Sequence, residues 1–288
     1  MIVILADTES HDVLRHFLNP PNWFTSASIA CSSYAMMLMA NGPPRPDEIA
    51  MACWLVALGG VFDMLDGRVA RALERFSEFG VQLDSIADIV GFGVAPAIIL
   101  YTWKLHLLGP LGVAVCFWFV LAAAFRLARF NVGVAEGSWP LPGHSEGLTS
   151  TMAGGLLVTF AWLANDYAAG RLDPAPELVA GLAALFGLGM VSSVPCISFK
   201  DLGTNRYAQA LLGASVIASA IGAIVVHPSL FFGIGGTIYL VVGSVDALVT
   251  TIRHREALRQ YHERVKVEAK ARLAKAKAAR AAKKSAKR

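Results

Sequence analysis

Long apolar stretches separated by short polar or turn-forming segments dominate the hydrophobic pattern of this chain. A membrane-spanning helix needs about 20 predominantly apolar residues, and stretches of about this length recur throughout the sequence. We predict such spans at residues 23–41, 49–65, 81–103, 108–128, 150–165, 177–197, 207–226 and 230–251. Segments rich in Gly, Pro and polar residues separate them. The pattern therefore predicts an all-α fold, a polytopic membrane helix bundle of about eight transmembrane helices.

The composition agrees with a membrane-embedded body. Of the 288 residues, 55% are hydrophobic and 16% are charged, and the mean hydropathy is +0.53. Soluble domains carry about 25% charged residues, so these values argue against a soluble enzyme and against a disordered chain. The four cysteines lie far apart in apolar runs, which favours core positions over a disulfide or zinc framework. We expect no cleaved signal peptide, because no basic segment followed by a long apolar run precedes Asn22.

Basic residues concentrate at the C-terminus. Residues 253–288 hold 14 of the 25 Lys and Arg but three of the 21 Asp and Glu, so the rest of the chain is net acidic. We therefore expect an N-terminal cytoplasmic segment at 1–21, a membrane-embedded domain at 22–252 and a basic cytoplasmic tail at 253–288. The tail lacks the aromatic interleaving of nucleic-acid-binding segments. We expect it to lie near anionic headgroups and expect no nucleic-acid partner.

The distribution of basic residues between the predicted spans gives the orientation. The ends of the second, fourth and sixth predicted spans, with the segments that follow them, contain Arg68, Arg71, Arg75, Arg126, Arg129, Lys200 and Arg206. The segments on the other side hold only Arg45, Lys104 and Arg171. Basic residues are enriched on the cytoplasmic side of membrane proteins. We therefore predict a multi-pass protein of the cell membrane with both termini in the cytoplasm.

Four aspartates flank the predicted turn between the second and third spans. Asp63 and Asp66 are three residues apart, and Asp84 and Asp88 are four apart, so each pair lies on one face of a helix. A hairpin would bring the two pairs together. Four carboxylates at membrane depth repel one another and are costly to desolvate. A pair of divalent cations or Arg71 would balance them, and oxygen ligands suit Mg²⁺, Mn²⁺ or Ca²⁺. The other interpretation is ordinary helix-end acids paired with arginines.

The register of these residues resembles the signature of the CDP-alcohol phosphotransferase family. It reads Asp63-x-x-Asp66-Gly67-x-x-Ala70-Arg71, then eight residues, then Gly80-x-x-x-Asp84-x-x-x-Asp88. The resemblance implies that the four aspartates bind two divalent metals, which hold the diphosphate of a CDP-linked lipid. It also implies that Asp88 is the general base for the incoming alcohol.

The same resemblance implies further contacts to the donor lipid. Gly67, Arg71 and the hydroxyl of Ser77 would contact its nucleotide and phosphates. Asn22 and Thr25, an Asn-x-x-Thr pair in the first span, resemble the family's N-terminal contact to the same group. From the residues alone, Asn22 and Thr25 could also be caps at the start of a helix. The resemblance also implies a homodimer.

Two other segments resemble the branch of the family that uses serine as the acceptor. They are FRLARFN at 125–131 and VSSVPCISFKDL at 191–202. This implies transfer of a phosphatidyl group from CDP-diacylglycerol to L-serine with release of CMP, a step of phospholipid biosynthesis. Arg126 and Arg129 could bind the serine carboxylate as a bidentate fork, and Asn131 could share the polar contacts. The arginines could equally be topology markers, and Lys200 carries the same ambiguity.

Competing functions remain open at this point. The segment 143–155 departs from the Gly-Leu-Pro-x-Pro pattern of the serine branch, which leaves choline, inositol, glycerol 3-phosphate or an archaeal-type lipid donor as competitors. A cation transporter would need carboxylates on several spans, and Asp246 is the one candidate outside the motif. A membrane scaffold that recruits partners through the tail is a third class. His144, Ser145 and Glu146 are adjacent in sequence, which is not the geometry of a catalytic triad.

Overall fold

Helices make up nearly all of the part of the chain that the structure describes. The structure is a computed structural model, and it describes residues 19–73, 77–136, 144–167, 173–197, 229, 246–261, 263–264 and 267. The α-helices are α2 (Pro20–Ala40), α3 (Pro46–Ala72), α4 (Glu78–Ile89), α5 (Ala95–Trp103), α6 (Pro110–Glu136), α7 (Ser150–Trp162) and α8 (Pro176–Val191). The π-helical segments η1 (Val90–Val94) and η3 (Leu163–Tyr167) and the 3₁₀ turn η2 (Leu105–Leu108) extend them. Residues 246–253 and 255–261 are also helical.

The first six predicted spans each correspond to a helix, so the all-α class is confirmed. Among the described residues, three helices are long and apolar enough to cross a membrane, namely Pro46–Ala72, Glu78–Trp103 and Pro110–Val132. The predicted number of about eight spans is not confirmed. Helices α7 and α8 have 13 and 16 residues, fewer than the about 20 that a span needs. The predicted seventh span and most of the predicted eighth lie outside the described residues.

Helix α3 is longer than predicted. The apolar pattern ends near residue 65, but the helix continues to Ala72 because good helix formers follow Gly67. Arg68 and Arg71 therefore lie on the last turns of α3 rather than beyond its end. As a result, Asp63 and Asp66 lie well inside the helix.

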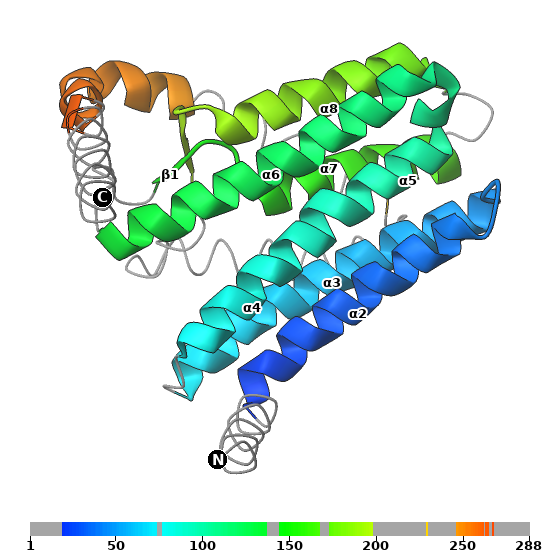
Figure 1. The fold of residues 1–288 in the computed structure, drawn as a ribbon, viewed down its shortest axis with the longest axis horizontal. Helices are drawn as coiled ribbons and strands as arrows, with labels where there is room; N and C mark the ends of the chain where they lie inside the picture. The colour runs from blue at the N-terminus through cyan, green and yellow to red at the C-terminus, as the bar shows by residue number, and fades with distance from the viewer. Residues whose placement is uncertain are drawn as a thin grey trace, which may run out of the picture.

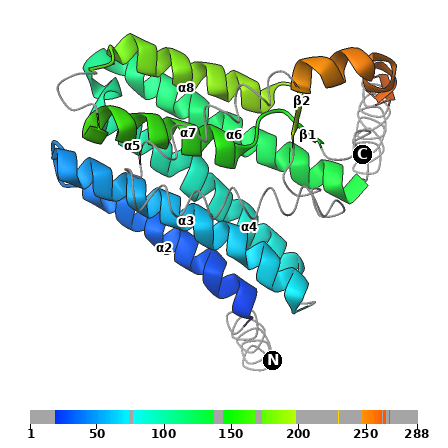
Figure 2. The same ribbon diagram turned by 180° about the vertical axis from the view of Figure 1, so that it is seen from behind.

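Helices α2 and α3 form an antiparallel pair, and the continuous helix α4–η1–α5 crosses beside them (Figure 1). The α2–α3 pair packs closely through small residues: a Cβ at Gly59 would lie 3.3 Å from Ser32 Oγ. Close approach at small residues is typical of helix association in membranes. Helices α6 and α8 lie side by side, and α7 lies behind them, as the reverse view shows (Figure 2).

A two-stranded antiparallel ribbon lies at one end of the bundle. Strand β1 (His144–Glu146) pairs with β2 (Pro195–Ile197), with Ser145 opposite Cys196. We predicted helix up to residue 197, and that is wrong: α8 ends at Val191, because Pro195 disfavours helix in the residue before it. The helical segment 246–261 lies next to the ribbon (Figures 1 and 2).

A close contact between α7 and η1 gives a test of this packing. A Cβ at Gly154 on α7 would lie 2.3 Å from the carbonyl oxygen of Phe92, whereas one at Gly155 would meet nothing within 4 Å. We expect Gly154→Ala to lower the free energy of unfolding by about 1–3 kcal/mol through overpacking. Gly155→Ala, the matched control, should leave it unchanged or raise it slightly. Thermal unfolding of the purified variants in detergent measures both, and equal melting temperatures would contradict the packing.

Candidate functional site

Three aspartates meet where α3 and α4 lie next to each other. Carboxylate oxygens of Asp63 and Asp66 on α3 and of Asp84 on α4 all lie within 4.8 Å of one another. Asp66 is buried, with an exposed fraction of 6%, and the other two are half-buried. Carboxylates gathered this closely form a donor set that suits a hard divalent cation. The fold therefore brings Asp84, from the second half of the motif, next to Asp63 and Asp66, from the first half, as a hairpin predicts.

Asp88 lies one turn beyond Asp84 on α4 and is also half-buried. Residues four apart share a helix face, so Asp88 extends the acidic face of α4 toward η1. The group of three carboxylates within 4.8 Å does not include it. Asp88 is thus adjacent to the cluster, in a position different from that of its three members.

Helix α2 contributes buried polar side chains to the same place. The hydroxyl of Thr25 donates a hydrogen bond of 2.6 Å to Asp66 Oδ2. A Cβ at Gly80 would lie 3.2 Å from Asn22 Oδ1, so Asn22 faces the start of α4. The N-cap of α2 is Asn19, and Asn22 and Thr25 lie inside the helix. The helix-cap interpretation of these two residues is therefore wrong.

Gly67, Arg71 and Ser77 surround the turn between α3 and α4. A Cβ at Gly67 would lie 3.6 Å from Arg71 Nη1, so the guanidinium lies over a backbone left open by the glycine. Ser77 is the N-cap of α4, and its Oγ accepts a hydrogen bond of 3.0 Å from the Gly80 amide. A Cβ at Gly80 would come 3.0 Å from that oxygen. These three of the five predicted donor-binding residues therefore lie on the two sides of the α3–α4 turn, on the same two helices as the carboxylates.

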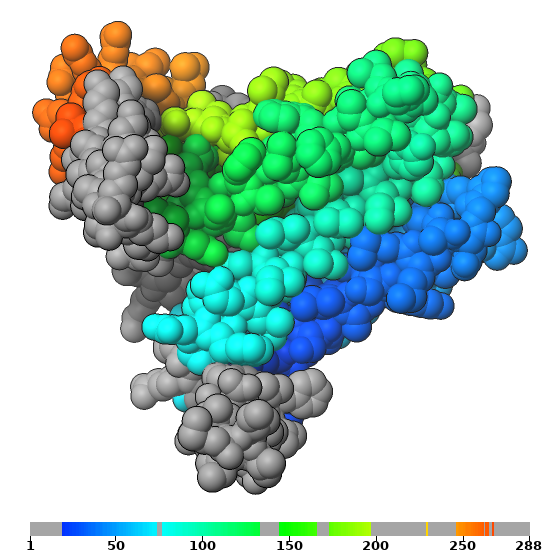
Figure 3. Space-filling view, viewed as in Figure 1, coloured from blue at the N-terminus to red at the C-terminus, as the bar shows by residue number. Residues whose placement is uncertain are grey.

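Asn131 connects the C-terminal half of α6 to the acidic helix. Its Nδ2 donates a hydrogen bond of 2.9 Å to Ser85 Oγ. Ser85 directly follows Asp84 on α4. In the space-filling view α4 lies against α2 on one side and against α6 on the other (Figure 3). The bond therefore brings one of the predicted acceptor-binding residues to the edge of the carboxylate site.

The two arginines of α6 have different surroundings. Arg126 is buried, with an exposed fraction of 7%, and its Nη1 donates to Ser150 Oγ at 3.2 Å. Arg129 donates to four backbone carbonyls, with N–O distances of 2.9–3.1 Å, at Glu146, Met190, Val191 and Ser192. A cation at the carbonyl end of a helix is stabilising. Arg129 thus holds the end of α8 against β1, whereas Arg126 points at the start of α7.

The C-terminal helical segment reaches this region from a distant part of the sequence. His144 Nε2 lies 2.9 Å from Asp246 Oδ2, and the Tyr261 hydroxyl donates to Glu146 Oε2 at 3.5 Å. Burial raises the pKa of the Cys196 thiol above its ordinary value. The positive charge of Arg126 opposes this rise, and the negative charge of Asp246 adds to it. Asp246 therefore lies beside the ribbon. Sequence reasoning missed these contacts, because they join residues about a hundred positions apart that carry no shared motif.

The ribbon also excludes the adjacent catalytic triad. Successive side chains of a strand point to opposite faces, so Ser145 faces away from His144 and Glu146. Its hydroxyl donates to the Gly147 carbonyl at 3.2 Å, and His144 pairs with Asp246. The expectation that no triad forms here is consistent with these contacts. Lys200, the remaining candidate of the acceptor region, lies outside the described residues.

Comparison with known proteins gives a consistent result. The sequence model of the CDP-alcohol phosphatidyltransferase family matches residues 18–194. A protein of Helicobacter pylori strain J99 named CDP-diacylglycerol–serine O-phosphatidyltransferase is 36% identical over 187 residues, which are 64% of this chain and 74% of that protein. A protein of the same name from Methanocaldococcus jannaschii is 39% identical over 140 residues, which are 49% of this chain and 60% of that protein. Another from Saccharomyces cerevisiae is 46% identical over 92 residues, which are 32% of this chain and 33% of that protein.

The carboxylate cluster predicts cation binding that a single substitution weakens. We expect the purified protein to bind Mn²⁺, and Asp84→Asn to weaken binding by at least about tenfold, because one of three adjacent negative charges is lost. Asp47→Asn is the matched control, since Asp47 is an exposed acid at the opposite end of α3. The electron paramagnetic resonance signal of free Mn²⁺ measures binding. An equal loss in both variants would show that the cluster is not the site.

Proposed function

We propose, since this chain belongs to the CDP-alcohol phosphatidyltransferase family, that it transfers a phosphatidyl group from CDP-diacylglycerol to L-serine and releases CMP. The observation that carries the proposal is the meeting of Asp63, Asp66 and Asp84 beside Thr25 and the α3–α4 turn. The relatives named for serine transfer support the choice of acceptor. Because the described part of the chain contains three helices that are long and apolar enough to span a membrane, both lipid substrate and lipid product can stay in the bilayer.

The donor would be held at the α3–α4 turn. Asp63, Asp66, Asp84 and Asp88 would hold two divalent cations, Mg²⁺ or Mn²⁺ being the best match to their oxygens and Ca²⁺ a further possibility. Such cations neutralise a diphosphate and stabilise the charge of the leaving phosphate. Arg71 would pair with a phosphate oxygen close to the open backbone of Gly67. Asn22 and Ser77, which face Gly80 from two helices, would hydrogen-bond the nucleotide.

The transfer needs one new bond, one broken bond and one proton acceptor. The serine hydroxyl oxygen bonds to the phosphorus that carries diacylglycerol, and the bond from that phosphorus to the oxygen bridging to CMP breaks. The hydroxyl proton passes to the carboxylate of Asp88, because an alcohol is a poor nucleophile until a base removes its proton. Asp88 suits this role because it is half-buried, one turn from Asp84, and outside the tightest group of carboxylates.

The acceptor would bind between α4 and the C-terminal half of α6. Arg126 is the better candidate for the serine carboxylate, since Arg129 already donates to four carbonyls. Arg129 is then a positioning residue that fixes the ribbon around the acceptor. Asn131, bonded to Ser85 between Asp84 and Asp88, would complete the polar contacts. Choline, inositol and glycerol 3-phosphate remain the competing acceptors.

We further propose that the site opens to the cytoplasm and that both termini lie on that side. Arg68, Arg71, Arg126 and Arg129 lie toward one end of the helices, and Arg45 and Lys104 toward the other, as the enrichment of basic residues on the cytoplasmic side requires. The homodimer rests on the family resemblance. A cation transporter is disfavoured, because Asp246 pairs with His144 beside the ribbon and extends no row of carboxylates through the helices.

Release of CMP tests the reaction and its acceptor. Purified protein given CDP-diacylglycerol and Mg²⁺ or Mn²⁺ should release CMP and form a serine phospholipid only when L-serine is present. We expect Asp88→Asn to lower kcat by at least about a hundredfold, the size of a general-base contribution, and Asp47→Asn to retain activity. CMP release that depends on a different alcohol would show that this alcohol, and not serine, is the acceptor. If folded protein releases no CMP with any of the alcohols, the proposed transfer is refuted.

Substitutions of the two arginines of α6 should have different effects, one on serine kinetics and the other on stability. Arg126→Gln should raise the KM for serine by about tenfold or more with a smaller change in kcat, because a charge-assisted hydrogen bond is lost. Arg129→Gln should instead lower the free energy of unfolding by about 2 kcal/mol or more, because the C-terminal carbonyls of α8 lose a charged donor. Serine kinetics and thermal unfolding measured on both variants decide this. A rise in KM confined to Arg129→Gln would reverse the assignment.

A further inference from the structure

A buried serine lies against the guanidinium group that we assign to the acceptor. Ser150 is the first residue of α7 and has an exposed fraction of 1%. Its Oγ accepts a hydrogen bond of 3.2 Å from Nη1 of Arg126, which is also buried. In the part of the chain that the structure describes, this is the one hydrogen bond of the hydroxyl. Because neither group is open to water, the bond is strong and directs the guanidinium toward the start of α7.

An aromatic ring bounds the same guanidinium from its own helix. The Cζ atom of Arg126 lies 5.6 Å from the centre of the Phe130 ring, one turn further along α6. A guanidinium group is planar and is attracted to the face of a ring. The ring and the Ser150 hydroxyl together fix the plane in which the N–H groups lie. Two parallel hydrogen bonds to a carboxylate depend on that plane, so the guanidinium is oriented before an acceptor arrives.

The two helices that carry this pair are anchored to the same place, the end of α8. On α6, Arg129 lies one turn beyond Arg126 and donates hydrogen bonds to carbonyls at the end of α8. Just before α7, the Leu148 amide donates a hydrogen bond of 3.0 Å to the Gly189 carbonyl of α8. The end of α8 therefore sets how far Arg126 lies from Ser150.

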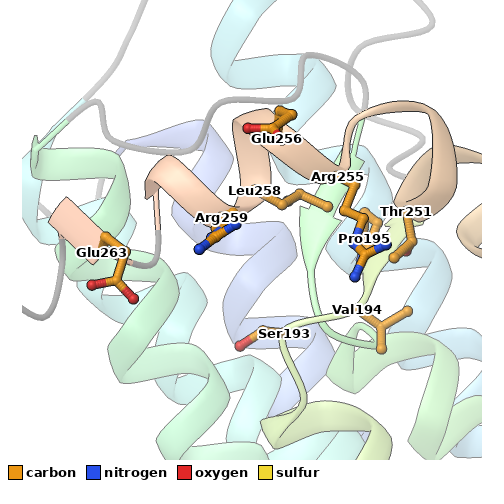
Figure 4. A pocket seen from close by; sticks show the side chains of 9 residues that line it. All are labelled: Ser193, Val194, Pro195, Thr251, Arg255, Glu256, Leu258, Arg259 and Glu263. Carbon is orange, nitrogen blue, oxygen red and sulfur yellow. The ribbon is translucent and has the colours of Figure 1, made fainter.

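The backbone that leads to Ser150 is also tied to the connection between α8 and β2. The Gly147 amide donates a hydrogen bond of 2.9 Å to the Val194 carbonyl. Gly147 has a φ of +76°, and a Cβ there would lie 2.6 Å from a carbonyl oxygen of α8, so a larger residue would be strained. On its other side the connection faces the C-terminal helical segment across a cavity of about 740 Å³, with Thr251 and Arg255 near Val194 and Pro195 (Figure 4). The course of this backbone is therefore fixed by the fold and not by the acceptor.

Ser150 lies at the same depth in the bundle as the proposed base. Helix α7 runs in the same direction as α4–η1–α5, since Gly154 meets Phe92 and aromatic rings near the ends of α5 and α7 have centres 6.2 Å apart. Ser150 precedes Gly154 by four residues, and Asp88 precedes Phe92 by four. Both therefore lie one turn before the close contact of the two helices. An acceptor with its hydroxyl at Asp88 would have Arg126 and Ser150 beside it.

We propose that Ser150 is a positioning residue for the acceptor, which holds the Arg126 guanidinium in the orientation that receives the serine carboxylate. This inference rests on the proposed transfer to serine. Ser150 acts through Arg126 and does not itself contact the acceptor. Its loss should therefore weaken the binding of an acceptor that has a carboxylate and leave the chemical step unchanged.

CMP release by the full chain at increasing concentrations of L-serine tests this role. We expect Ser150→Ala to raise the KM for L-serine by about three- to tenfold, the size of one hydrogen bond, with a change in kcat below about twofold. L-serinamide has a neutral amide in place of the carboxylate, so its KM should not respond to Ser150→Ala. The matched control is Thr159→Val, which removes a hydroxyl from the same helix that bonds the Gly155 carbonyl at 2.7 Å. The control should leave both KM values unchanged.

A second substitution separates positioning from direct contact. In an Arg126→Gln background, Ser150→Ala should raise the KM for L-serine no further, because Ser150 acts only through the guanidinium. A further rise in that background would mean that Ser150 touches the acceptor. That result, an unchanged KM in Ser150→Ala alone, or equal rises for L-serine and L-serinamide would each overturn the proposal. If Ser150→Ala does not fold, Ser150→Cys is measured instead, since a thiol is a weak hydrogen-bonding group of similar size.

Failure of this role is distinguishable from failure of the transfer reaction. If CMP release depends on serine and Arg126→Gln raises the KM for serine while Ser150→Ala does not, the role of Ser150 alone is refuted. If Arg126→Gln leaves this KM unchanged, Arg126 and Ser150 both lose their roles, and the reaction stands. If the unaltered chain shows no serine-dependent CMP release, the choice of acceptor is refuted together with this role.

Discussion

The mutual repulsion of three carboxylates is the constraint on which this structure depends. Two unit charges 4 Å apart repel by about 4 kcal/mol at an effective dielectric constant of about 20, and Asp63, Asp66 and Asp84 bring three to within 4.8 Å. A folded chain tolerates this only if other contacts hold the helices together or if cations occupy the centre. The hydrogen bond that the Thr25 hydroxyl donates to the buried Asp66 offsets a small part of this repulsion. Divalent cations would convert this repulsion into attraction, so the electrostatic cost of the cluster would be the source of the cation affinity that we propose.

The helices around the cluster are held by contacts that leave little freedom. Small residues let α2, α3 and η1 approach closely: a Cβ at Gly59 or at Gly91 would lie 3.1–3.3 Å from Ser32 Oγ. Helix α7 presses Gly154 against the backbone of Phe92 in η1. The π-helical segment follows Asp88 directly, and such segments are frequent at functional sites. Interiors packed this closely transmit displacement, so a cation that draws α3 and α4 together would also act on α2 and α7.

The parts of the fold that sequence predicted are those determined by local periodicity. Apolar stretches gave six helices, and helical spacing placed Asp63, Asp66 and Asp84 on facing surfaces. The wrong predictions arose where non-local contacts decide. Pro195 limits how far α8 can extend, but nothing in the run 177–197 predicts that Pro195 begins a strand, because the strand exists only through pairing with residues 144–146. The four carbonyl partners of Arg129 and the His144–Asp246 contact join segments that no periodicity relates.

The described contacts form a chain from the carboxylates to the C-terminal helical segment 246–261. Asn131 joins α4 to α6, Arg129 joins α6 to α8 and β1, and His144 and Glu146 on β1 join Asp246 and Tyr261 of the C-terminal segment. Each junction is polar and lies beside the proposed acceptor, whereas the donor side rests on the helix pair α2–α3. Family members with different acceptors would then share α2, α3 and α4 and differ along α6, the ribbon and the segment that covers it. Arg126 is buried between these parts, so we expect relatives that use a different acceptor to differ at this position before the others.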